Sequence, residues 1–372
     1  MPENSDICVP PLEDLALIRD AVRQAGAIAK AAYIANDSKR WDKSDNSPVT
    51  EADIAVNDFL DKTLRAARPN YGWLSEETKD DHSRHACPRS FVVDPIDGTR
   101  AFIDRTPNFA VCVAVIENGK SVAGAVFNPL KDEMYPAAVG QGAWLNGETI
   151  SATTPTAIQG ISMVGYPRKF RRLGFPDMNV RIANSMAYRM VLVASGEADA
   201  TIAFTPKSDW DVAAAALIAT EAGAVVTDIR GVAPQFDGPT TSGLGVICAG
   251  PRLHALLLAA VKPHLAQFAR GKDFQFLGTT MNDRKKDTAN MKSVQLLHLV
   301  IGGELLDPMR TEFKDLTQVD FVGAYANQAD ARKAWKSAAQ RTVDNAHMRY
   351  YIAHLHRLRD EETSASPTEE LE

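Results

Sequence analysis

Cysteine is scarce in this sequence, and its few copies lie far apart. The 372 residues include only Cys8, Cys87, Cys112 and Cys248, and none has the spacing of a zinc site. This pattern excludes a disulfide scaffold and a cysteine-based metal centre as the basis of the fold. Cys112 and Cys248 lie in apolar, strand-like segments, where we expect buried thiols. Such cysteine usage is typical of a protein in the reducing cytoplasm.

Long apolar segments and excess positive charge are also absent. No segment approaches about 18 uninterrupted apolar residues, so we expect no transmembrane helix. The first residues, MPENSD, show no signal-peptide pattern. The net charge of −6 argues against binding to a nucleic acid polymer. It does not exclude an anionic small molecule, because a bound cation would reverse the local field.

The most informative segment is 91–99, FVVDPIDGT, in which an apolar strand leads into two acids and a Gly-Thr pair. The strand would hold Asp94 and Asp97 at the edge of a sheet. The amides of Gly98 and Thr99 could then face an anion at the start of a helix. Carboxylates beside a phosphate require cations between them, and Mg²⁺ prefers such oxygen ligands. The alternative is an Asp-Pro turn in which Asp97 caps the next helix.

Three further segments place acids where they could join this site. They are 47–53 (SPVTEAD), 73–78 (WLSEET) and 208–216 (SDWDVAAAA). These further acids favour a shared acidic site over an Asp-Pro turn alone.

Each of these segments also has a purely structural interpretation. Glu76 and its acidic neighbour could be ordinary surface residues. Thr50 and Asp53 fit a helix capping box, a role that does not exclude a second one. Acids in the first turn of an Ala-rich helix complement its dipole. We therefore interpret Asp209 as the N-cap and Asp211 as the ligand candidate.

Together, these four segments resemble the signatures of the inositol monophosphatase superfamily of Mg²⁺-dependent, Li⁺-sensitive phosphatases. The resemblance covers roughly residues 10–268. WLSEET, DPIDGTRAFI and DWDVAAA are most similar to the CysQ-type branch, the 3'(2'),5'-bisphosphate nucleotidases, although Arg100-Ala-Phe replaces the more frequent Arg-Glu-Phe. The resemblance implies an α/β (α+β) fold, a layered α-β-α-β-α sandwich, with a small α+β domain after it.

The resemblance also implies a site with two Mg²⁺ ions, and a third held loosely through Glu76. Asp94 would bridge the two main ions. Glu76 and the carbonyl of Ile96 would complete the first metal site, and Asp97 and Asp211 the second. Inhibition by Li⁺ is implied by the same resemblance.

Other residues gain catalytic or substrate roles from the resemblance. Asp53 would orient Thr99, which polarises the attacking water. Gly98 and Thr99 would also contact the substrate. Ser185 and Arg189 begin a helix that borders the substrate in related proteins.

The expected substrate is a small phosphorylated metabolite, with the 3'-phosphate of 3'-phosphoadenosine 5'-phosphate as the first expectation. Inositol-type members carry an acid shortly before the metal-binding Asp of the WD motif, whereas the corresponding segment 203–207 (AFTPK) has none. Inositol 1-phosphate or another sugar phosphate is the alternative. A non-catalytic regulatory protein on the same fold is a further alternative, but none of the implied ligand residues is missing.

Apolar periodicity predicts the secondary structure of the first 268 residues. In the first helix, Leu12, Leu15, Ile18 and Val22 would share a buried face. Asn118-Gly119 predicts a hairpin turn within 109–128. The predicted helices are 11–35, 51–67, 185–196, 209–222 and 251–268, and the other predicted strands are 91–94, 198–204, 224–229 and 244–248.

A second domain is predicted at the C-terminal end. The polar segment 269–292 would link the phosphatase domain, 1–268, to a small domain at 293–360, and the acidic tail 361–372 would be disordered. Within the small domain, LHLVIGGE and VDNAHMRY are similar to a domain of unknown function found in alphaproteobacteria, which implies no activity. A homodimer is a possible assembly.

The small domain is predicted to be a βαβ-type unit, with a strand at 294–301, a helix at 327–346 and a strand at 348–356. His298 and the pair His354 and His356 fit a polar sheet face. A metal site built from these histidines is the alternative.

Overall fold

The computed structural model describes residues 10–43, 47–265, 297–305, 313–325, 328–342 and 347–355. The chain divides into two compact units, residues 1–277 and 278–372, and each is described by itself. The predicted linker 269–292 and tail 361–372 lie outside the described residues, so the predicted domain boundaries stay predictions.

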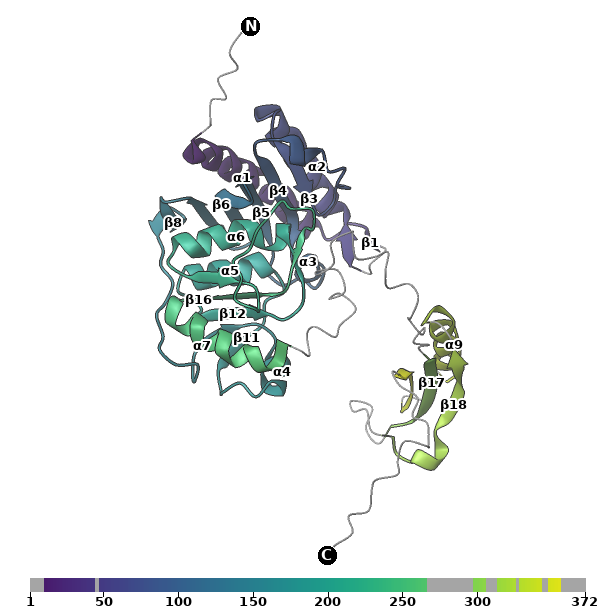
Figure 1. Cartoon of the computed structure of the whole chain (residues 1–372). Coiled ribbons are helices and arrows are strands. Elements are labelled where there is room, and N and C mark those ends of the chain that lie inside the picture. The colour runs from purple at the N-terminus through teal and green to yellow at the C-terminus, as the bar shows by residue number, and fades with distance from the viewer. Residues whose placement is uncertain are drawn as a thin grey trace, which may run out of the picture. The chain divides into compact units, whose positions relative to one another are not determined.

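A seven-stranded sheet is the larger of the two main sheets of the first unit (Figure 1). Its strands pair in sequence order, and β3 and β4 are the parallel pair. Asn118 and Gly119 both have positive φ at the turn between β5 and β6, which confirms the predicted hairpin. The strands are β3 Gly72–Ser75, β4 Ser90–Asp97, β5 Ala110–Glu117, β6 Lys120–Asn128, β7 Glu133–Ala138, β8 Gly142–Leu145 and β9 Glu148–Thr149.

Both faces of this sheet are buried, because alternate residues of its strands join different cores. On β5, Val111 and Val113 pack with the helices of one face, whereas Cys112 and Ala114 pack with those of the other. Cys112 is therefore the core thiol that the sequence predicted. Helices α1 (Pro11–Ala35) and α2 (Glu51–Ala67) cover the first face, and α5 (Met186–Ala194) and α6 (Asp209–Glu221) cover the second.

A second sheet of five strands lies beyond α5 and α6, so these two helices are sandwiched between sheets (Figure 1). Its strand order is β11-β10-β12-β16-β14. Phe170 of α4 and Leu253 of α7 pack on its outer side. The predicted α-β-α-β-α layering is thus confirmed. These elements are β10 Ser162–Val164, β11 Asn179–Arg181, β12 Ala200–Ala203, β14 Val225–Thr227, β16 Val246–Ala249, α4 Pro167–Arg172 and α7 Pro251–Val261.

Close approach of α6 to the large sheet requires a glycine at one point. A Cβ on Gly124 of β6 would lie 2.9 Å from the carbonyl oxygen of Ala214, a distance that real Cβ atoms do not show. The small residues of the Ala-rich segment and this glycine together let the helix that carries Asp211 lie directly on the sheet that carries Asp94.

Short elements complete the first unit. Four of them form two antiparallel pairs, β1 with β2 and β13 with β15. Their bounds, with those of the short helices, are β1 Arg40–Asp42, β2 Pro48–Thr50, β13 Lys207–Ser208, β15 Ser242–Gly243, α3 Thr99–Ile103, η1 Ser83–Ala86 and η2 Lys262–His264.

Several predicted details of the first unit were wrong. Leu12 is 50% exposed, because it lies in the first turn of α1, before the helix reaches the core. The strand predicted at 91–94 continues to Asp97, since pairing with β5 resumes after an irregularity. Helix α7 ends at Val261, where a short 3₁₀ turn begins at Lys262 and Pro263 follows.

The second unit has a three-stranded antiparallel sheet of order β18-β17-β19, with α9 packed against all three strands. The predicted βαβ arrangement was wrong, because β17 and β19 are antiparallel neighbours and an unpredicted strand, β18, precedes the helix. The bounds are β17 Leu297–Glu304, η5 Leu316–Gln318, β18 Asp320–Tyr325, α9 Gln328–Arg341 and β19 Met348–Leu355.

The histidines of the second unit lie partly within the described strands. His298 and His354 are opposite each other in the register of β17 and β19, and His298 is buried. His356 lies outside the described residues. A role for these histidines stays a prediction.

Within the described residues, no helix is long and apolar enough to cross a membrane. The predicted cytoplasmic location stays a prediction.

Candidate active site

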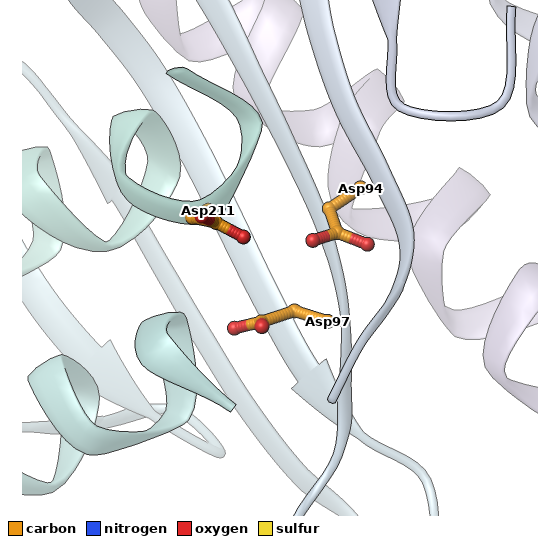
Figure 2. A group of neighbouring side chains, drawn as sticks. All are labelled: Asp94, Asp97 and Asp211. Carbon is orange, nitrogen blue, oxygen red and sulfur yellow. The ribbon is translucent and has the colours of Figure 1, made fainter. Parts of the chain in front are cut away.

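Three carboxylates meet at the end of β4 and the start of α6. Asp94, Asp97 and Asp211 each offer an oxygen, and these oxygens all lie within 4.8 Å of one another. Figure 2 shows the three side chains converging on one small region between the strand and the helix. The group is therefore compact enough to hold a metal ion through three ligands at once.

An irregularity in β4 explains why both of its acids take part. Residues three apart on a regular strand face opposite sides of the sheet. Here Asp94 pairs with Cys112 and Asp97 pairs with Ala110, so β4 holds one extra residue between the two pairs. This β-bulge turns both carboxylates toward α6. The bulge therefore lets the two acids of the DPID segment take part in one site.

Asp94 is the most constrained member of the group. Its side chain is 1% exposed, and within the described residues neither of its carboxylate oxygens has a hydrogen-bond partner. Burial, followed by the charges of Glu76 and Asp97, raises the pKa of Asp94 well above its ordinary value. A buried carboxylate without donors is costly unless a cation binds it. The site therefore fits a metal ligand at this position.

Asp97 is held by the N-terminus of α5. Its carboxylate accepts hydrogen bonds from the Ser185 hydroxyl at 2.6 Å, the Ala187 amide at 2.6 Å and the Met186 amide at 3.2 Å. These donors favour the charged form, but burial and the charge of Asp211 outweigh them and raise the pKa of Asp97 to about 7.

Ser185 is the N-cap of α5, and its oxygen also accepts from the Tyr188 amide at 2.9 Å. The structure places the Ser185 hydroxyl fully buried against Asp97, so its observed partner is a carboxylate of the site.

Asp211 belongs to the capping box of α6. Ser208 is the N-cap, and its amide donates to Asp211 at 3.1 Å. The Lys207 ammonium lies 3.5 Å from the same carboxylate. The prediction that Asp209 is the N-cap was wrong, because Asp209 is the first helical residue and accepts from the Asp237 amide at 2.8 Å.

Glu76 lies next to this group but is not one of its three members. The Lys43 ammonium is 2.8 Å from Glu76 and 2.6 Å from Glu77, and both acids are partly or largely shielded from solvent. Burial raises the pKa of Glu76, and its charge acts in turn on Asp94. These glutamates are therefore not the ordinary surface acids of the alternative interpretation.

Thr99 and Asp53 form a connected pair beside the carboxylates. The Thr99 hydroxyl is 3.1 Å from Asp53 and 3.2 Å from the carbonyl oxygen of Ile96. The other oxygen of Asp53 accepts from the amide and hydroxyl of Thr50, at 2.8 and 2.5 Å. The predicted capping box is confirmed, and Asp53 makes it without losing its contact to Thr99.

Gly98 makes the sharp turn between β4 and α3. Its φ of 98° lies in the left-handed region, and a Cβ there would lie 3.1 Å from both the Asn108 carbonyl oxygen and the Ser185 side chain. A side chain at this position would push apart the two elements that hold Asp97.

Comparison with known proteins decides the family. A family model described as "Inositol monophosphatase family" matches residues 13–266, about two thirds of the chain. The chain belongs to the inositol monophosphatase family. A second model, described as "Domain of unknown function (DUF4170)", matches residues 296–355.

Two curated relatives illustrate this membership. The chain is 31% identical over 262 residues to "Nus factor SuhB" of Escherichia coli K12, a match that covers 66% of this chain and 94% of that protein. It is 34% identical over 249 residues to "Inositol monophosphatase" of Dictyostelium discoideum, covering 63% of this chain and 89% of that protein.

Solved structures share the fold of the first unit. The extragenic suppressor protein suhB of Bartonella henselae aligns with a TM-score of 0.60 and 25% identity, covering 67% of this chain and 98% of that one. The Thermotoga maritima protein described as "IMPase TM1415" shows the same fold, with a TM-score of 0.59 and 24% identity, covering 69% of this chain and 99% of that one.

Members of the inositol monophosphatase family are metal-dependent phosphatases that generally use Mg²⁺, and the group of Asp94, Asp97 and Asp211 could hold such an ion. The relatives found carry the names SuhB and inositol monophosphatase. The bisphosphate-nucleotidase branch is therefore not shown by these matches.

Sequence reasoning did not single out every residue that the structure brings to this inositol monophosphatase site. Lys207 lies four residues before Asp211, a separation that could have signalled an ion pair. Tyr166 and Lys169, next to and on α4, line a cavity that Lys207 also lines, and no local pattern indicated this. Their position depends on how the second sheet packs, which a single sequence does not reveal.

Proposed function

We propose that the first unit hydrolyses a small phosphomonoester at the Asp94 group with the help of Mg²⁺. The observation that carries this proposal is the buried Asp94 carboxylate, which lacks a donor within the described residues and lies beside two further acids. Without a cation, this arrangement would be strongly destabilising. With Mg²⁺ bound, the same carboxylates become suitable oxygen ligands.

In this proposal each carboxylate has one role as a ligand. Asp94 would bridge two ions, Glu76 and the carbonyl of Ile96 would complete one site, and Asp97 and Asp211 would complete the other. Bound Mg²⁺ supplies an activated water and stabilises negative charge on the reacting phosphate. Glu76 would bind the metal in one of two ways. Either its carboxylate leaves Lys43, or one of its oxygens keeps the contact with Lys43 while the other binds the metal.

Thr99 and Asp53 would orient the attacking water. The Thr99 hydroxyl donates a hydrogen bond to Asp53, so the lone pairs of that hydroxyl oxygen can accept a hydrogen bond from water. The contacts from Thr50 hold Asp53 in place for this role. The amides of Gly98 and Thr99 remain proposed substrate contacts.

For the substrate, we propose 3'-phosphoadenosine 5'-phosphate, with inositol 1-phosphate or another sugar phosphate as the second candidate. The segment 203–207 supports the first choice, because it holds Phe204 and Lys207 where inositol-type members carry an acid. Arg189, buried beside Asp97 on α5, is the proposed residue that borders the substrate.

Phosphate release by the full-length protein tests this proposal. In excess Mg²⁺ we expect release from 3'-phosphoadenosine 5'-phosphate with a higher kcat/KM than from inositol 1-phosphate or fructose 1,6-bisphosphate. Chelation of the metal should lower the rate by about a hundredfold or more, because the carboxylates then repel the substrate. We also expect Li⁺ to inhibit in the same assay. A folded protein that releases no phosphate from any of the three would favour the non-catalytic alternative.

We further propose that the whole catalytic site lies before residue 268, since every proposed ligand does. The role of the second unit and the formation of a homodimer have no support in the geometry of this site.

A further inference from the structure

A cavity of about 130 Å³ lies beside the carboxylate group, between α4, α5 and the segment that leads into α6. Three cationic side chains line it: Lys169, Arg189 and Lys207. None of the described residues that line it is Asp or Glu. A cavity lined by three cations and by no described acid is suited to an anion.

The cations are held close together by an aromatic ring. The Arg189 guanidinium carbon lies 4.8 Å from the centre of the Tyr166 ring, and the Lys169 ammonium lies 5.9 Å from it. Arg189 is 3% exposed, and its Nε donates to the Ala183 carbonyl at 2.5 Å. This buried hydrogen bond fixes the guanidinium, so the cavity has one rigid, buried cation to which Lys169 and Lys207 add two more accessible ones.

The charge of the cavity is not balanced by its own walls. Burial, with the neighbouring charges of Arg189 and Lys207, lowers the pKa of Lys169. Burial also lowers the pKa of Arg189. Both shifts show that the positive forms are disfavoured by their surroundings, which an incoming anion would reverse.

The cavity adjoins the carboxylate group through two elements. Lys207 lines the cavity while its ammonium lies 3.5 Å from Asp211. Helix α5 carries Arg189 and also binds Asp97 through its first amides. One small molecule could therefore contact both regions at once.

We propose that this cavity binds a second phosphate group of the substrate, with Lys169 and Lys207 as specificity-determining residues beside Arg189. The inference rests on the proposed function, since it assumes that the other phosphate reacts at Asp94. It makes the preferred substrate a bisphosphorylated small molecule, whereas an uncharged polyol would place no negative charge beside Lys169 and Arg189.

Two kinds of measurement test this with Lys169→Gln and a matched control, Arg171→Gln. Arg171 is an exposed cation of the same short helix that does not line the cavity. The first measurement is kcat/KM for 3'-phosphoadenosine 5'-phosphate and for 3'-AMP, which lacks the second phosphate. Lys169→Gln should lower the first value about tenfold and leave the second within about twofold, because one charged hydrogen bond is lost. The control should change neither.

The second measurement does not depend on catalysis. Binding of 5'-AMP and of fructose 6-phosphate is measured by calorimetry in the presence of chelator, so that no metal draws phosphate to the carboxylates. We expect Lys169→Gln to weaken about tenfold the binding of the ligand whose phosphate the cavity accepts. The ligand whose binding changes more shows whether the cavity prefers the phosphate of a nucleoside or that of a sugar. Equal binding by wild type, Lys169→Gln and the control, or no binding of either ligand, would overturn the inference even in an active phosphatase. Weakened binding in a protein without phosphatase activity would support it and reject the proposed function instead.

Discussion

Replacing Asp94 by asparagine is expected to lower kcat by about a thousandfold or more, which corresponds to roughly 4 kcal/mol of transition-state stabilisation. In the proposed site Asp94 would contact two ions, and an amide would supply neither its charge nor a second anionic oxygen. The rate is measured in saturating Mg²⁺, so that weaker metal binding alone does not explain the loss. The matched control is Asp104→Asn, an exposed acid shortly after the same segment, which should retain activity within about twofold.

A second readout separates lost chemistry from lost folding. Without metal, Asp94→Asn should unfold at a temperature no lower than that of wild type, because it removes a buried carboxylate that has no donor within the described residues. Added Mg²⁺ should raise the unfolding temperature of wild type but not of the variant, since ligands stabilise only the state that binds them. Turnover within tenfold of wild type would reject Asp94 as the bridging ligand.

Replacing Asp14 by alanine is expected to destabilise the first unit by about 3 kcal/mol, because it breaks a buried ionic network. Asp14 is completely buried on α1 and binds Arg68 at 3.0 Å, Tyr71 at 2.8 Å and Arg89 at 2.8 Å. Arg89 is 4% exposed, and after the change it loses its buried carboxylate partner while its contacts to Glu117 and Tyr71 remain. The network ties α1 to the segments that enter β3 and β4.

Calorimetric unfolding measures this effect, with Asp20→Ala as the control. Asp20 lies on the same helix, but its side chain is largely exposed and pairs with Arg19 on the surface. We expect the control to change stability by less than about 0.5 kcal/mol. If Asp14→Ala were no less stable than the control, the network would not contribute to the stability of the first unit.

The parts of the fold that follow from local pattern were predictable. The boundaries of α1 and α2 match the predicted ranges 11–35 and 51–67, because both helices have one continuous apolar face. The turn at Asn118-Gly119 was predictable because few other residue pairs adopt its backbone geometry. The capping box of Thr50 and Asp53 was also predictable, because its contacts lie within four residues of the chain.

Features that depend on packing between distant segments were not predictable. The bulge that turns Asp94 and Asp97 to one side arises from pairing with β5. The antiparallel order of the second unit required a strand, β18, whose pattern did not stand out from its surroundings. The contact of Ser185 with Asp97 depends on how α5 lies between two sheets.

The residues of the site could be predicted from the sequence better than the contacts between them. The sequence indicated Asp94, Asp97 and Asp211 as ligands, and the structure places their oxygens within 4.8 Å of one another. It did not indicate that Lys43 pairs with Glu76, or that Lys169 lies beside Arg189, because both contacts join separate parts of the chain.

The most direct test of the metal-dependent site is a crystal structure of the full-length protein soaked with Mn²⁺, a close substitute for Mg²⁺ at oxygen ligands. Its anomalous signal locates the ions independently of any activity. We expect anomalous peaks within bonding distance of Asp94, with Asp97 and Asp211 sharing one of them. Saturating Mn²⁺ bound only at other positions, with Asp94 contacting no ion, would contradict the assignment of this group as the catalytic metal centre.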